Sequence, residues 1–120
     1  MKENILKDKS FKFSIRIVKL SQFLVNNKKE YILSKQILRS GTSIGAMIRE
    51  AEYAESKADF IHKLSIALKE ANETEYWLDI LFNTQYFDEK LYSSLIKDAK
   101  ELLKLLISII KTTKTNLKTS

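Results

Sequence analysis

Two carboxylates and one histidine are the side chains in this sequence that could most readily do chemistry. Glu75 falls in the middle of a helical apolar stripe, and burying a carboxylate without a partner is costly. One hypothesis is that Glu75 and Glu50 share an acid–base or metal site. We favour the other, in which Arg39 and Glu75 form a buried polar pair, or Glu75 is exposed at the bundle end. His62 is the only histidine, and we interpret it as an interface side chain.

The composition argues against catalysis. The chain has no cysteine, which excludes disulfides and thiol chemistry, and one histidine cannot build a histidine metal site. No local motif supports a metal site made of carboxylates alone, and no nucleophile stands beside a base and an orienting group. We therefore expect a protein that is not an enzyme and that uses no cofactor and no metal.

A run of small residues surrounds Gly41 and Gly45 and invites a second chemical interpretation. A glycine-rich loop that cradles phosphate follows a strand and usually ends in Lys followed by Ser or Thr. Neither feature is present, so we interpret the run as a helix whose small side chains let a neighbour approach closely. Each internal glycine costs that helix about 1 kcal/mol relative to alanine.

The segment after this run predicts the longest regular element. Apolar residues recur there at steps of three and four, which predicts a helix over 57–84. Ser56 and Asp59 form a variant of the capping box at its start. A second set of apolar residues lies on the opposite side of this helix, which the bundle core would not cover. We therefore expect an oligomer interface at Ile66, Trp77 and Ile80. Tyr76 and Trp77 could instead stack on bases, but packing between subunits is favoured.

Similar periodicity predicts three further helices, over 10–26, 33–55 and 88–112. Ser10 and Asp88 are the expected N-caps of the first and last, and both chain termini are expected to fray. The chain has no proline and two glycines, so short polar connections between antiparallel neighbours are expected. We predict an all-α fold: one domain over 1–120, an antiparallel up-down-up-down four-helix bundle.

Positive charge is unevenly distributed along a chain of net charge +6. Residues 1–29 carry eight basic and two acidic side chains, and residues 85–120 carry seven and four. Within the first helix the basic residues follow steps of three and four along one side: Lys9, Lys12, Arg16 and Lys19. Such a stripe fits contacts with RNA or DNA phosphates, and it equally fits an ordinary solvated face.

Two segments of the sequence resemble a known family. The first is LRSGTSIGA over 38–46, and the second is DFIHKLSIALKEA over 59–71, followed by EYWL over 75–78. Over nearly the whole chain, the sequence is similar to the four-helix-bundle family named after 23S rRNA intervening sequences, the S23 family. The family usually has Asn where this chain has Met47, so a polar contact made by that Asn would be lost here.

The resemblance implies an assembly and a loose function. The family is bacterial, its relatives form ring-shaped homopentamers, and most members have no assigned activity. A related branch is the accessory variability protein of diversity-generating retroelements. Resemblance to that branch implies contact with nucleic acid and with a reverse transcriptase.

Two classes of function remain open from the sequence. The first is a homo-oligomer that binds RNA or DNA through its basic surface, and the second is a protein–protein scaffold or accessory subunit without a direct nucleic-acid role. Excess apolar surface on the first, third and fourth helices favours an oligomer in either case. The amino terminus lacks the pattern of a secretory signal, and the longest apolar run is too short for a membrane helix. We therefore expect a soluble, cytoplasmic protein that does not contact a membrane.

Overall fold

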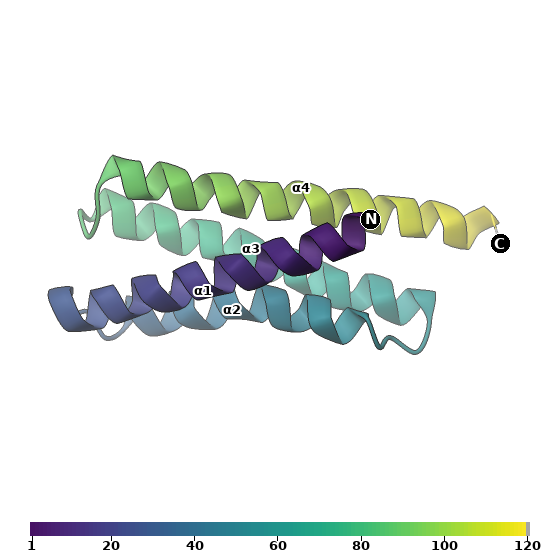
Figure 1. Cartoon of the computed structure of the whole chain (residues 1–120), viewed down its shortest axis with the longest axis horizontal. Coiled ribbons are helices and arrows are strands. Elements are labelled where there is room, and N and C mark those ends of the chain that lie inside the picture. Colours follow the sequence, from purple (N-terminus) through teal and green to yellow (C-terminus); the bar gives the residue numbers. More distant parts are fainter. Residues whose placement is uncertain (120) are drawn as a thin grey trace.

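The computed structural model describes residues 1–119, with side chains up to Leu117. Its helices are α1 (Lys2–Lys28), α2 (Leu33–Ala51), α3 (Lys57–Asn83) and α4 (Glu89–Thr119). Consecutive helices run antiparallel and pack against each other, and α1 also packs against α4, which closes the bundle (Figure 1). The predicted all-α up-down-up-down four-helix bundle is therefore confirmed.

α1 begins at Lys2 rather than at residue 10. Ser10 is not its N-cap, because it lies inside the helix, is 2% exposed, and donates its hydroxyl to the carbonyl of Lys7 over 3.0 Å. Leu6 explains the longer helix: its side chain is 1% exposed and anchors the first turns in the core. At the other end Lys29 adopts a left-handed conformation, with φ 55, and closes the helix.

α2 ends at Ala51, four residues before the predicted end at 55. The backbone N–H groups of Glu52 and Tyr53 bond to carbonyls three residues earlier, which tightens the chain into turns. Tyr53 is 83% exposed, so it does not hold a further helical turn against the core.

α3 begins where the sequence predicts. The hydroxyl of Ser56 accepts a hydrogen bond from the N–H of Asp59 over 3.0 Å. The carboxylate of Asp59 reaches back and accepts from the N–H of Glu55 over 3.2 Å. The reciprocal bonds of the predicted capping box are therefore present, with the second one shifted one residue outward.

Asp88 caps α4 as predicted, with Oδ1 accepting from the N–H of Leu91 over 2.9 Å. The helix does not end near residue 112 but continues to Thr119, and it reaches past the other helices in Figure 1. The hydroxyls of Thr113 and Thr115 donate to carbonyls four residues earlier over 2.7 and 3.0 Å, so these polar side chains are satisfied within the helix. No described helix, α4 included, is both long and apolar enough to cross a membrane.

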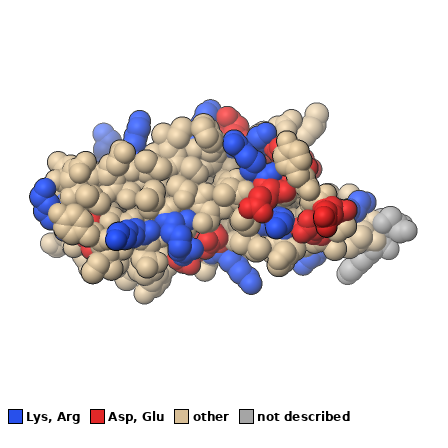
Figure 2. Space-filling model, turned by 90° about the horizontal axis from the view of Figure 1, so that it is seen from below, with Lys and Arg blue, Asp and Glu red and all other residues tan. Residues whose placement is uncertain are grey.

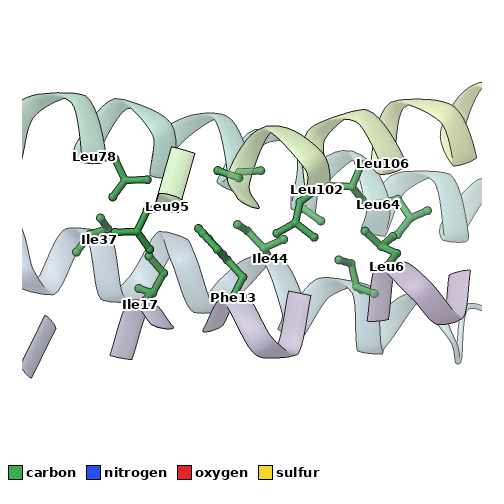
Figure 3. Packing of buried hydrophobic residues seen from close by; sticks show 14 of the residues in the cluster. Leu6, Phe13, Ile17, Ile37, Ile44, Leu64, Leu78, Leu95, Leu102 and Leu106 are labelled. Carbon is green, nitrogen blue, oxygen red and sulfur yellow. The ribbon is translucent and has the colours of Figure 1, made fainter. Parts of the chain in front are cut away.

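Side chains from all four helices meet in one apolar core (Figure 3). α1 and α2 approach closely at Gly41, where a Cβ would lie 2.7 Å from Cγ2 of the buried Ile17. At Gly45 the nearest atom to an added Cβ is Oγ of Ser14, at 3.2 Å. The prediction that this small-residue run is a helix allowing a close neighbour is therefore confirmed.

Candidate functional site

Two members of the basic row predicted on α1, Lys9 and Arg16, contact α4. Lys9 places Nζ 2.6 Å from Oε1 of Glu101. Arg16 places Nη1 2.6 Å from Oδ2 of Asp98 and 3.4 Å from the carbonyl of Ser94. These contacts join the first helix to the last along the edge where the two meet.

The other two members of the row differ from each other. Lys12 forms an ion pair with Asp8 of its own helix, with Nζ 3.0 Å from Oδ2. Lys19 forms no ion pair with any described carboxylate and lines a cleft of about 360 Å³ between α1 and α4. Of the four predicted phosphate ligands, only Lys19 is therefore free of an acidic partner.

Lys9 and Glu101 hold each other in their charged forms. The hydrogen bond to Glu101 and its negative charge raise the pKa of Lys9. The same hydrogen bond and the positive charge of Lys9 lower the pKa of Glu101. A phosphate that bound Lys9 or Arg16 would have to compete with a carboxylate already in place.

Arg39 and Glu75 do not form the predicted pair. Arg39 on α2 instead binds two carboxylates of α3: Nη1 lies 2.8 Å from Oε2 of Glu70, and Nη2 contacts Glu73. Glu75 places Oε1 3.0 Å from Nζ of Lys100 on α4. Helical geometry explains the error, because Glu75 is turned by about 200° from Glu73 and so lies on the other side of α3.

The residues predicted at an oligomer interface, Ile66, Trp77 and Ile80, are partly buried within the single chain. Trp77 packs against the core, and its indole Nε1 donates to Oε2 of Glu73 over 3.0 Å. That hydrogen bond, together with Arg39, lowers the pKa of Glu73. Trp77 thus supports the ion cluster between α2 and α3, and its place in an interface stays a prediction.

An exposed apolar row on α1 is a second candidate interface. Phe11, Ile15 and Val18 are 55%, 42% and 37% exposed, and their spacing of four and three places them on one side of the helix. We call these three residues the α1 ridge. The core uses the other side of α1, around Phe13 and Ile17, so the ridge is part of the excess apolar surface that the sequence predicts on this helix.

The ridge borders a shallow hollow over α2. A cleft of about 380 Å³ there is lined mainly by small or uncharged side chains, among them Phe11, Ser14, Thr42, Gly45 and Ala46. Figure 2 shows this α1–α2 side, with uncharged side chains over much of its centre and charged ones toward its borders and one end. The guanidinium of Arg49 lies at the rim, 6.0 Å from the Phe11 ring. Lys7 and Glu50 also line this cleft, so an apolar row with an exposed aromatic residue lies beside charged side chains. Exposed aromatic residues are enriched in protein interfaces.

Glu50 and Glu75 do not share the acid–base or metal site that the sequence left open. Oε1 of Glu50 lies 3.3 Å from Nζ of Lys63, whereas Glu75 binds Lys100 on another face. His62 is exposed on α3. In the described part of the chain, no three His, Cys, Asp or Glu side chains gather so that they could hold a metal ion.

Comparisons with known proteins agree with this architecture. Residues 2–108 match the family of the 23S rRNA-intervening sequence protein. The chain is similar, at 65% identity and a TM-score of 0.91, to the crystal structure of a protein with unknown function from the S23 ribosomal protein family of Bacteroides thetaiotaomicron VPI-5482. The match covers 92% of this chain and 99% of that chain. No curated protein matches the sequence. The chain belongs to the 23S rRNA-intervening sequence protein family.

Proposed function

We propose that this protein is a non-enzymatic, cytoplasmic homo-oligomer that binds RNA or DNA by charge. The observation that supports assembly is the α1 ridge, since a row of three exposed large apolar side chains is typical of an interaction site. A second copy of the chain fits this site because the hollow beside the ridge has a floor of small side chains, among them Ser14, Gly45 and Ala46, which an apolar ridge can enter, and charged side chains line part of the rest of it. Resemblance to ring-forming relatives makes a pentamer the expected assembly.

Assembly multiplies a weak attraction for polyanions. Each chain carries a net charge of +6, and copies held together present that charge several times to one nucleic acid. Contacts that are weak in one subunit then add through their high effective concentration. Neutralised phosphates release counterions, so affinity falls steeply as salt rises, and sequence preference is small because charge contacts do not read bases.

Light scattering tests the assembly. The wild-type protein is expected to give an oligomer mass at micromolar concentration, and the Ile15→Glu, Val18→Glu double variant a monomer mass. The Ile32→Glu, Tyr53→Glu double variant is the matched control, because these two side chains are 74% and 83% exposed and lie outside the ridge. Circular dichroism checks that each variant keeps its helices. A wild-type monomer, or a double variant that assembles normally, would contradict the proposed interface.

Fluorescence anisotropy tests the binding. Labelled RNA and DNA oligonucleotides are titrated with wild-type protein at several salt concentrations. Binding at low salt that weakens steeply with added salt supports the proposal. No binding at low salt to either nucleic acid contradicts it.

The second candidate function is a protein–protein scaffold or accessory subunit, for example of a reverse transcriptase, without a direct nucleic-acid role. One observation favours it: Lys9, Lys12 and Arg16 already hold carboxylates of the same chain. This candidate predicts an intact oligomer that fails to bind nucleic acid at low salt. Light scattering and the anisotropy titration together therefore separate the two candidates.

A further inference from the structure

α4 carries a row of exposed lysines on its solvent side, seven residues apart: Lys90, Lys97, Lys104 and Lys111. Seven residues make nearly two helical turns, so the row drifts by only about 20° at each step. All four side chains therefore occupy one sector of the helix surface. Among the described residues, none of the four forms an ion pair. We call these residues the α4 lysine row.

The carboxylates beside this row are bound by α1. Asp98 and Glu101 lie between Lys97 and Lys104 in the sequence. Asp98 is held by Arg16, and Glu101 is held by Lys9. The basic residues of α1 thus make the direct contacts with these two carboxylates, while Lys97 and Lys104 act on the Glu101 charge only at longer range.

We propose that the α4 lysine row, rather than the α1 row, is the surface of the chain that contacts nucleic-acid phosphates. This inference rests on the proposed nucleic-acid binding and names the site for it. From Lys90 to Lys111 the helix rises by about 32 Å, at about 1.5 Å per residue. That length matches roughly nine steps of a nucleic-acid strand at about 3.4 Å each. A row of flexible cations along one side of a helix suits a phosphate backbone that runs alongside it.

A nucleic acid fits the row better than an anionic membrane surface does. Helices that lie on membranes combine basic residues with a broad apolar face that enters the lipid. Between the lysines of this row the only large apolar side chain that is mainly exposed is Ile107, at 53%. The row therefore offers charge without the apolar face that membrane binding requires.

Charge-matched variants test the site. One carries Lys97→Gln, Lys104→Gln and Lys111→Gln. The control carries Lys35→Gln, Lys57→Gln and Lys69→Gln, which removes the same charge from exposed lysines of α2 and α3 that form no ion pair with a described residue. Both are titrated with labelled RNA and DNA oligonucleotides across a range of salt concentrations, and light scattering checks that both assemble.

The expected result is a change in salt dependence confined to the α4 variant. Each lost phosphate contact lowers the slope of log affinity against log salt by about 0.7 on a single strand and about 0.9 on a duplex. In the α4 variant, the magnitude of this slope should therefore decrease by about 2 to 3. Its affinity at low salt should fall at least about tenfold. The control should keep the wild-type slope. Replacing the same three lysines of α4 by Arg should preserve binding, since the charge is kept.

The possible outcomes separate this inference from the proposed function. If the wild-type protein does not bind at low salt, the proposed function fails. A second outcome is that the wild-type protein binds while the α4 variant keeps the wild-type slope, or while both variants show the same decrease in slope. In either case the α4 lysine row is not the phosphate contact, and the proposed function stands. Binding to phosphatidylserine vesicles but not to oligonucleotides would show that the row binds an anionic membrane surface and not nucleic acid. Should the triple variant not assemble, Lys104→Gln alone must lower the slope by about 0.7 to 0.9.

Discussion

Arg16 and Asp98 join the first and last helices of the bundle, with Nη1 of Arg16 2.6 Å from Oδ2 of Asp98. The two residues are 82 positions apart in the chain, so their contact helps to close the bundle where α1 meets α4. Their side chains are 34% and 42% exposed, which leaves both partly in water.

This exposure predicts a small contribution to stability. Exposed ion pairs contribute at most about 1 kcal/mol, so a double-mutant cycle of Arg16→Gln and Asp98→Asn should give a coupling of about 0.5 kcal/mol. Urea denaturation measures it, and the coupling should shrink as salt screens the charges. A coupling of about 3 kcal/mol or more, as in buried pairs, would contradict this assignment.

The two glycines of α2 should respond differently to alanine. A Cβ at Gly41 would lie 2.7 and 2.8 Å from the side chain of Ile17, which is fully buried and cannot move aside. Overpacking in Gly41→Ala should therefore lower the free energy of unfolding by about 1–3 kcal/mol. The higher helix propensity of alanine should restore about 1 kcal/mol of that loss.

Gly45→Ala is the matched control for that prediction. The nearest atom to its Cβ is Oγ of Ser14 at 3.2 Å, so the strain is smaller and the propensity gain should roughly cancel it. Thermal denaturation followed by circular dichroism compares the two variants. Equal melting temperatures would show that the close approach of Ile17 to Gly41 does not make an added Cβ destabilising.

Glu75 should prove structural rather than functional. It is 16% exposed, while its partner Lys100 is 61% exposed, so Glu75→Gln should cost less than about 1 kcal/mol and leave folding intact. Glu75→Leu should be neutral or stabilising, because Lys100 can be hydrated alone and the leucine extends an apolar stripe. Melting temperatures of both variants and of Lys100→Gln test this. Unchanged stability with lost nucleic-acid or partner binding would instead give Glu75 a functional role.

Tyr92 makes stability depend on pH in the alkaline range. Its hydroxyl donates to Oδ1 of Asp79 over 2.5 Å, and this bond and burial raise the pKa of Tyr92 from 10.0 to about 12. Between these two values the unfolded chain releases a proton that the folded chain keeps, which favours unfolding. The contribution of Tyr92 should be fully present below pH 10.0 and lost as pH rises toward about 12.

Denaturant unfolding of the wild-type protein and Tyr92→Phe across this pH range measures that contribution. The difference in unfolding free energy between the two proteins should fall with rising pH, since only the wild-type protein carries this phenol. A difference that stays constant with pH would show that the hydrogen bond to Asp79 does not hold the proton.

Helix order and two helix starts could be predicted because their signals are local. Ser56 and Asp88 each cap an N–H group three residues further on, so the sequence carries both partners side by side. The start of α1 could not be predicted in the same way. Leu6 keeps residues 2–9 helical only because the folded bundle provides a core for it to enter.

The candidate surfaces were only partly predictable. The apolar stripe of Phe11, Ile15 and Val18 is visible in the sequence, but its exposure depends on which side of α1 the other helices cover. The α3 residues expected at the interface turn out instead to be partly buried within the chain. Trp77 looks unpartnered along its own helix, yet it packs against the core and binds Glu73, which Arg39 of α2 also binds.

The sequence by itself determined the helices and their order, because a stripe of apolar residues at steps of three and four specifies a helix and its buried side. Only the tertiary structure decided which charges meet. Arg39 pairs with Glu70 and Glu73 because α2 packs on the side of α3 where those two carboxylates lie. The spacing on α1 predicts that Arg16 binds phosphate, and only the packing of α4 shows that Asp98, 82 residues away in the sequence, lies against it. Spacing along one helix is a local property, whereas ion pairing across two helices depends on how they pack.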